Sequence, residues 1–259
     1  MPFRVSTQPA FSINSFALNA AAITMTAILC LLSVCPQVFA QKRRTFDGGG
    51  ARAVVVDERL AVLRGAPDIS APLVQRLSRG RVVFISGVRR TPDGLLFYRV
   101  AVTRRTRGWL QSDSVVVPAR AGEDARLARL INGSESFDRL ARARIFLDVF
   151  PKSTVRPAIL LLYGDAAEDA AAKLSRDAGK RLDEREVVAG GAPGFSYYLN
   201  FNELDRYQRN GINFVFDRTA KQFHYDGASW REILRRYPRS PEAEQARARL
   251  ASLQSVSRR

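Results

Sequence analysis

Few side chains in this sequence have the types and spacing that catalysis requires. His224 is the only histidine, so a metal site with two histidine ligands is excluded. Asp165, Glu168 and Asp169 stand at helical spacing, and paired carboxylates can hydrolyse glycans, but beside basic residues such spacing is typical of a solvated helix face. Ser196 lacks the second glycine of a nucleophile elbow. The sequence therefore predicts no catalytic residue, no metal site and no cofactor, with a weak glycan-processing enzyme as an alternative.

Residues suited to binding lie earlier, in a stretch that is rich in β-formers. Arg64 and Asp68 fall in its first long loop, where they could present charge to a peptide. Phe97 and Tyr98 are adjacent on an apolar run, so we expect one of them in the core and the other exposed. We predict that Arg64, Asp68 and Tyr98 line a ligand groove. The alternative is that the arginine and the aspartate form only a local bridge.

The elements that must position these residues differ along the chain. Residues 51–118 contain about five short apolar runs separated by turn signals, among them Pro92-Asp93-Gly94. Several short strands in so few residues favour a small closed barrel. Residues 122–255 change to helical periodicity. The predicted fold class is therefore multidomain β plus α, with a β-barrel followed by an α-helical domain.

The β-rich stretch resembles bacterial SH3-like domains over residues 51–117. The run from Leu60 to Pro67 is similar to the opening signature of that family, and Arg79-Gly80 is similar to its strand-entry glycine motif. Gly108 and Trp109 match its Gly-Trp pair, which makes them the structural signature of the domain. The resemblance implies an SH3-like barrel that binds cell-wall peptide. Trp109 stands in an apolar strand, and we expect it to be a core residue rather than a ligand platform.

Helix boundaries in the second half are marked by breakers and capping residues. A helix from Glu123 should stop at Asn132-Gly133, and Ser134 or Ser136 should cap the next, which ends at Phe150-Pro151. Near the C-terminus, the face formed by Trp230, Ile233, Leu234 and Tyr237 predicts a further helix. Residues 237–246 resemble the helix junction of tetratricopeptide repeats, and residues 158–174 resemble the small-residue first helix of such a repeat. This resemblance implies a degenerate, protein-binding helical domain.

An aromatic-rich stretch at 195–225 interrupts the helical pattern. Its nine aromatic side chains are Phe195, Tyr197, Tyr198, Phe201, Tyr207, Phe214, Phe216, Phe223 and Tyr225. They either fill the space between helix pairs, which we favour because aromatic residues dominate core burial, or present a concave surface to an extended peptide.

The N-terminus predicts export. Residues 1–40 have the apolar core and small-residue end of a secretory signal peptide, although a retained N-terminal membrane anchor is the alternative. Residues 41–50 form a linker, and both cysteines precede it, so a mature chain would hold no disulfide. The net charge is +16, but the arginines are dispersed, so we expect an anionic envelope surface rather than nucleic acid as a partner.

These features together predict a periplasmic or secreted protein that binds without catalysing a reaction. The barrel would hold cell-wall peptide or a protein partner, and the helical domain would mediate protein–protein interaction. A purely structural interaction protein with no cell-wall ligand is the remaining alternative.

Overall fold

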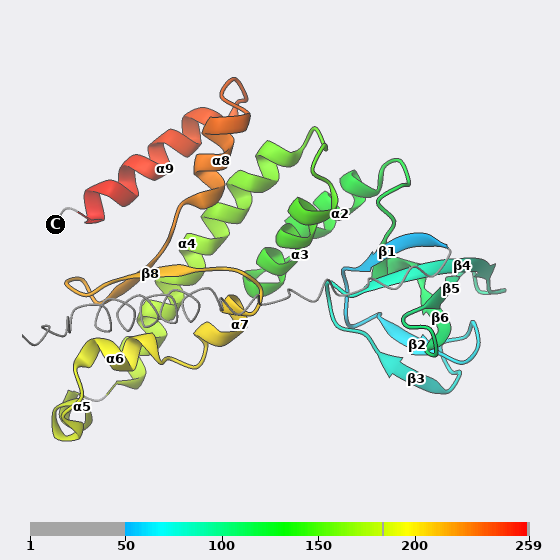
Figure 1. Cartoon of the computed structure of the whole chain (residues 1–259), viewed down its shortest axis with the longest axis horizontal. Helices are drawn as coiled ribbons and strands as arrows, with labels where there is room; N and C mark the ends of the chain where they lie inside the picture. Colours follow the sequence, from blue (N-terminus) through cyan, green and yellow to red (C-terminus); the bar gives the residue numbers. More distant parts are fainter. Residues whose placement is uncertain (1–49, 183, 258–259) are drawn as a thin grey trace, which may run out of the picture. The chain divides into compact units, whose positions relative to one another are not determined.

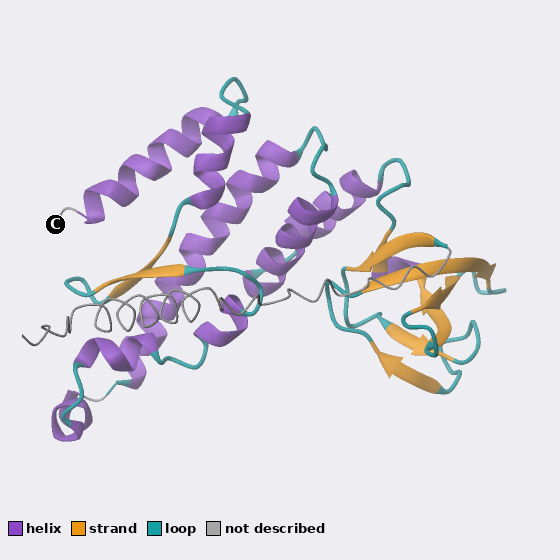
Figure 2. Ribbon diagram, in the orientation of Figure 1, coloured by secondary structure: helices purple, strands orange, loops and turns teal. Residues whose placement is uncertain are grey.

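The computed structural model describes residues 50–182 and 184–257 of the chain. An antiparallel β-sheet comes first and helices follow it, so the predicted mixture of β and α structure is confirmed (Figure 1). Figure 2 shows a second, short pair of strands among the helices. The expected signal peptide at 1–40, and the expected linker except its last residue, lie outside the described residues.

The sheet has the strand order β3-β2-β6-β5-β4-β1-β7. Its strands are β1 (Ala51–Val55), β2 (Val62–Arg64), β3 (Leu73–Arg76), β4 (Val82–Arg90), β5 (Leu96–Ala101), β6 (Arg107–Gln111) and β7 (Val115–Val116). A 3-10 turn at Ser112–Ser114 joins the last two. The sheet has seven strands, whereas about five were expected, and β3 illustrates why a strand escapes prediction. β3 is exposed at all four positions, so it lacks the buried apolar pattern that marks a strand.

The two faces of β1 and β7 pack against two different hydrophobic cores. Ala53 and Val55 belong to the core on one face of the sheet, together with Leu63, Val100 and Leu110. On the opposite face, the alternate residues Val54, Val56 and Val116 belong to the helical core. A strand that is buried on both faces has apolar residues at consecutive positions, which explains the unbroken run Val54-Val55-Val56. The sheet is therefore joined to the helices by a shared apolar cluster.

The first helices end where the sequence predicts. α2 (Glu123–Asn132) is followed by Gly133, and α3 (Ser136–Val149) stops at Phe150-Pro151. The predicted serine cap of α3 is wrong, because no side chain caps it: the hydroxyl of Ser134 instead donates to the carbonyl of Leu130 and accepts from Arg142. Ser134 is thus used to hold a buried arginine.

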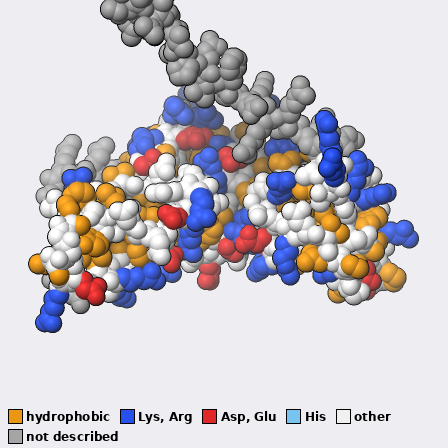
Figure 3. All heavy atoms as spheres, turned by 60° about the horizontal axis from the view of Figure 1, so that its bottom comes forward, with side chains coloured by type: hydrophobic (Ala, Val, Ile, Leu, Met, Phe, Trp, Pro, Cys, Tyr) orange, Lys and Arg blue, Asp and Glu red, His pale blue; other side chains and the backbone are white. Residues whose placement is uncertain are grey.

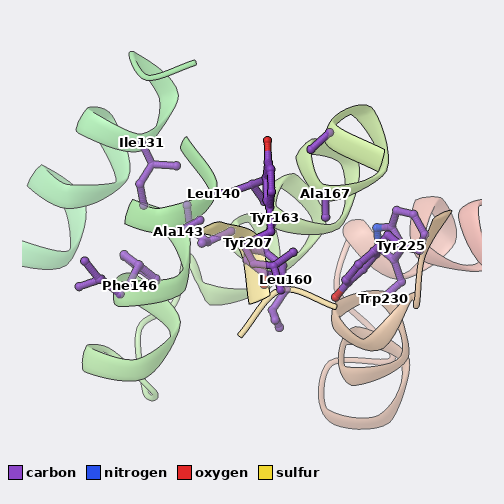
Figure 4. Close-up of a cluster of buried hydrophobic side chains, with 14 of the residues drawn as sticks. Ile131, Leu140, Ala143, Phe146, Leu160, Tyr163, Ala167, Tyr207, Tyr225 and Trp230 are labelled. Carbon is purple, nitrogen blue, oxygen red and sulfur yellow. The ribbon is translucent and has the colours of Figure 1, made fainter. Parts of the chain in front are cut away.

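The longest helix, α4 (Arg156–Arg181), packs against α3, against α8 (Ala228–Arg236) and against α9 (Glu242–Ser257). The predicted apolar face of α8 is confirmed for Trp230 and Ile233, which are 1% and 0% exposed. Gly164 allows the indole to approach α4, since a Cβ there would lie 2.6 Å from Cε2 of Trp230. Figure 4 shows Trp230 and Tyr225 beside each other in this core, and their ring centroids are 5.4 Å apart.

The segment between α4 and α8 is not wholly helical, which corrects the expectation of an α-helical domain over 122–255. After the short helices α5 (Glu184–Gly190), α6 (Gly194–Leu199) and α7 (Leu204–Gln208) comes a hairpin of β8 (Phe214–Asp217) and β9 (Gln222–Tyr225). Phe223, Tyr225 and Tyr207 are buried. Burial of these rings favours the interpretation that the aromatic stretch at 195–225 is mainly core.

Candidate ligand-binding face

The face of the sheet that points away from its core carries Trp109 between two arginines. Trp109 of β6 pairs with Arg64 of β2 on one side and with Arg99 of β5 on the other. Opposed residues of an antiparallel pair share a face, and the chain neighbours Leu63 and Leu110 are completely buried in the core. Trp109 itself is half-buried and lies outside both core clusters. The expectation that Trp109 is a core residue is therefore wrong.

This line of opposed residues extends across the neighbouring strands. Arg64 also pairs with Leu73 of β3, which is 56% exposed, just after a register shift. Arg99 also pairs with Gly87 of β4, where a Cβ would contact the Cβ of Arg99 at 3.5 Å. We call these five residues, Leu73, Arg64, Trp109, Arg99 and Gly87, the Trp109 row. The row combines one aromatic ring, one exposed aliphatic side chain and two cations.

Gly108 is needed for the close approach of β6 to β2. A Cβ at position 108 would lie 2.6 Å from the carbonyl oxygen of Arg64 and 2.8 Å from Cγ of Leu63. Contacts this short do not occur in folded proteins, so only glycine lets β6 come this close to β2. Gly108 thereby sets the pairing that places Trp109 beside Arg64.

Two of the three predicted binding residues lie in or beside the loop between β2 and β3. Arg64 donates from Nη1 to the carbonyl of Ala71 at 2.7 Å. Asp68 accepts from the N–H and the hydroxyl of Ser70, both at 2.7 Å. These hydrogen bonds, and to a smaller degree the charge of Arg64, lower the pKa of the Asp68 carboxyl. Arg64 belongs to the Trp109 row, whereas Asp68 is occupied within its own turn.

The third predicted residue, Tyr98, does not line a groove. Its ring belongs to the core of the sheet and is 3% exposed, while its hydroxyl accepts a hydrogen bond from Nη1 of Arg120 at 2.7 Å. Phe97 faces the other side of β5 and is also buried, at 1%. The expectation that one of this pair is exposed is wrong, because both faces of β5 are covered at this position.

The sheet is strongly basic. Residues 51–116 contain twelve arginines against five acidic residues, a net charge of +7. Among the described residues, Arg99 and Arg107 form no ion pair, and both are exposed. Lys and Arg side chains are prominent over the face drawn in Figure 3. An arginine without a carboxylate partner can form paired hydrogen bonds with a carboxylate of a ligand.

His224 has a structural partner that the sequence does not reveal. Its Nδ1 lies 2.8 Å from Oε1 of Glu168 in α4, and Oε2 of the same carboxylate accepts the backbone N–H of Tyr225 at 2.7 Å. Seven residues further along α4, the hydroxyl of Ser175 accepts the N–H of Phe223 at 2.7 Å. Glu168 and Ser175 of α4 thus accept hydrogen bonds from backbone N–H groups on the edge of β9 that is not paired with β8.

The prediction that the acidic residues of α4 form only a solvated face is wrong, because two of them hold other elements of the fold. Glu168 holds β9, and Asp165 accepts from Nε of Arg249 in α9 at 3.0 Å. Asp169 lines a small cavity of about 220 Å³ with Lys173 and Arg176. Each carboxylate has a different neighbourhood, so the three do not converge on one reacting centre.

Within residues 50–182 and 184–257, no group of three or more His, Asp or Glu side chains is arranged to hold a metal ion. In the same part of the chain, no helix combines the length and apolarity needed to cross a bilayer. In comparisons with known proteins, no family model matches this chain, and neither the curated proteins nor the solved structures include a significant match.

Proposed function

We propose that this protein is a non-catalytic binding protein of the cell envelope, and that the Trp109 row binds an acidic peptide. The sheet at 51–117 would be an SH3-like barrel, as the residues around Gly108 and Trp109 suggest. The leader at 1–40 would direct the chain to the periplasm or the exterior. The observation that carries the proposal is the placement of Trp109 between Arg64 and Arg99 on the outer face.

The chemistry of the row suits a peptide with carboxylates. The indole offers a flat apolar surface, and tryptophan and arginine are the side chains most often found at the energetic centres of interfaces. Leu73 adds an exposed aliphatic contact beside Arg64. The stem peptides of the cell wall carry free carboxylates and small aliphatic side chains, which match these features. Arg99 would pair with a carboxylate while the peptide backbone crosses the ring of Trp109.

Electrostatics would add to this contact without replacing it. The net charge of +7 over the sheet attracts any polyanion, and such attraction weakens as salt shortens the Debye length to about 8 Å at physiological ionic strength. A specific site should keep part of its affinity under those conditions. Dependence on Trp109 therefore separates recognition from general charge attraction.

Sedimentation with purified cell-wall sacculi tests the proposal. The chain without residues 1–40 should co-sediment at physiological salt, and Trp109→Ala should reduce the bound fraction about tenfold, in line with the loss of a central interface tryptophan. Arg247→Gln, which removes an exposed charge from α9, is the matched control and should bind normally. Absence of co-sedimentation would end the cell-wall proposal. Binding that disappears with salt and survives Trp109→Ala would show charge attraction alone.

A purely structural role is the second candidate, and it rests on a specific observation. Val54, Val56 and Val116 are buried in the helical core, so one face of the sheet is used for packing inside the chain. In this alternative, the sheet would brace the helices, and the helices would bind a protein partner. Binding experiments should therefore use the sheet and helices together, because separating them would expose these three valines.

A further inference from the structure

A cavity in the helical region is independent of the Trp109 row. Its volume is about 590 Å³, within the range of small-molecule sites. It lies where the C-terminal end of α4 meets α5, α6 and the β8–β9 hairpin. The lining residues are Gly179, Leu182, Val187, Val188, Gly194, Phe195, Tyr198, Phe216, Arg218 and Lys221.

Packed aromatic rings form the hairpin side of this cavity. Tyr198 stacks on Phe216 with ring centroids 5.1 Å apart, and Phe216 packs on the buried Phe223 at 5.0 Å. Val188 is 79% exposed, which leaves an apolar side chain at the edge of the cavity open to solvent. Such walls favour an apolar chain over a polar ligand.

The charged residues of the lining are both cations. The guanidinium carbon of Arg218 lies 4.1 Å from the ring centroid of Phe195, which holds the charge against the cavity wall. Neither Arg218 nor Lys221 forms an ion pair among the described residues. The nearby carboxylate of Asp217 is occupied, since it accepts the N–H groups of Thr219 at 2.8 Å and Ala220 at 3.1 Å.

Lys221 ends the turn between β8 and β9 in a backbone conformation that is costly for any residue other than glycine. Lys221 has a φ of +53°, in the left-handed region that favours glycine. Residues held in this region are costly and are found preferentially at binding sites. A glycine would fit the turn more easily, but it would supply no ammonium group to the cavity.

From the cavity, its apolar walls and its two cations, we infer a binding site for a small anionic amphiphile. The acyl chain would occupy the space between α4, α6 and Phe216. The head group, a carboxylate or a phosphate, would face Arg218 and Lys221. This site does not depend on the proposed function of the sheet.

Fluorescence binding with 11-(dansylamino)undecanoic acid tests the inference in the full chain. The probe should bind saturably, and dodecanoic acid or dodecyl phosphate should displace it; the stronger competitor identifies the head group. Dodecanol should compete at least about fivefold more weakly, because it lacks the charge that the two cations meet. Shortening the competing acid should weaken it about fourfold per methylene. No saturable binding, or equal competition by dodecanol, would overturn the inference.

Two variants test the site and should leave the fold intact: one fills the cavity and the other removes a cation. Gly179→Leu adds a side chain at the cavity, where a Cβ has ordinary contact at 3.7 Å with the Tyr198 hydroxyl, and it raises helix propensity. It should abolish probe binding. Lys221→Gly relieves the left-handed backbone and should weaken the acid about threefold or more while leaving dodecanol unchanged.

The controls are Ala158→Leu, at an exposed position near the start of α4, and Arg247→Gln in α9. Both should bind the probe normally, and all four variants should melt at or above the temperature of the parent within a few degrees. Unchanged binding in Gly179→Leu would place the probe elsewhere and contradict the inference.

Discussion

The carboxylate of Asp57 and the guanidinium of Arg142 lie 3.2 Å apart and are buried, with side chains 5% and 3% exposed. Asp57 follows β1, and Arg142 is in the middle of α3. Arg142 also donates to the carbonyl of Val56 at 3.1 Å and to the hydroxyl of Ser134 at 2.6 Å. Two of its three acceptors, Val56 and Asp57, directly follow β1, so this side chain connects the sheet to the helices, while Ser134 anchors it between α2 and α3. Arg59 shares the Asp57 carboxylate from the solvent side.

Replacing Arg142 should destabilise the whole chain. Arg142→Met leaves the carboxylate and two further buried acceptors without this donor, and breaking a buried pair typically costs about 3–5 kcal/mol. Urea denaturation measures the change in the free energy of unfolding. Arg129→Met is the control, since that side chain is exposed on α2 and forms no ion pair among the described residues, so its loss should cost less than about 1 kcal/mol. Equal costs for the two variants would contradict the connecting role of Arg142.

The Asp57 contacts should make stability depend on acid. The hydrogen bond from Arg59 is the largest cause that holds the pKa of Asp57 below its usual value, against the opposing effect of burial. Because folding lowers the pKa of Asp57, its charged carboxylate stabilises the fold at pH values above its unfolded pKa, which is near 3.9. This stabilisation is lost as the pH falls through the pKa of the folded state. Parent and Asp57→Asn should differ most in unfolding free energy at pH 6 and converge below about pH 4. A difference that stays constant down to pH 2 would argue against this titration.

Trp109 and Leu110 should respond differently to truncation, although they are neighbours. Leu110 is 0% exposed in the core of the sheet, so Leu110→Ala should cost about 2–5 kcal/mol and lower the melting temperature by many degrees. Trp109 lies on the outer face, and Trp109→Ala should cost less than about 1.5 kcal/mol. Thermal melting followed by circular dichroism checks both. If Trp109→Ala unfolds the protein, Trp109 contributes to the core and its placement on the outer face is contradicted.

Gly164 and Gly179 stand in the same helix and should give opposite results with alanine. Helix propensity alone favours alanine by about 1 kcal/mol at either site. At Gly164 the new Cβ would meet the buried Trp230, so overpacking should outweigh this gain and cost about 1–3 kcal/mol in net stability. At Gly179 a Cβ would make only ordinary contact, 3.7 Å from the Tyr198 hydroxyl, and stability should rise. Denaturant midpoints decide the matter, and a stabilising Gly164→Ala would show that Trp230 can move aside.

Local chemistry explains which elements were predictable. Phe150-Pro151 ends α3 because proline cannot continue a helix, and Gly133, a poor helix former, follows the last residue of α2. The β8–β9 hairpin was missed because its turn, from Arg218 to Lys221, lacks the Asn-Gly or Asp-Gly signal. Its strand edge is satisfied by Glu168 and Ser175, which lie about fifty residues earlier in the chain.

The residue pattern predicted only part of the candidate face. Arg64 was found because a charged residue in a loop is a local signal. Trp109 was recognised as a signature but assigned to the wrong side, and Tyr98 was assigned to a groove although it is core. The geometry of a strand predicts that consecutive side chains point to opposite faces of the sheet, but it does not predict which face is buried.

The order of β and α structure, the main helix ends and the basic character of the chain were predictable, because they follow from local propensity and composition. The placement of Trp109 between Arg64 and Arg99, the contact of Glu168 with the hairpin and the pairing of Arg142 with Asp57 arise only when the chain folds. Each of these contacts joins residues that are distant along the chain. Their partners are selected by strand register and by the burial of whole faces, which no single segment encodes.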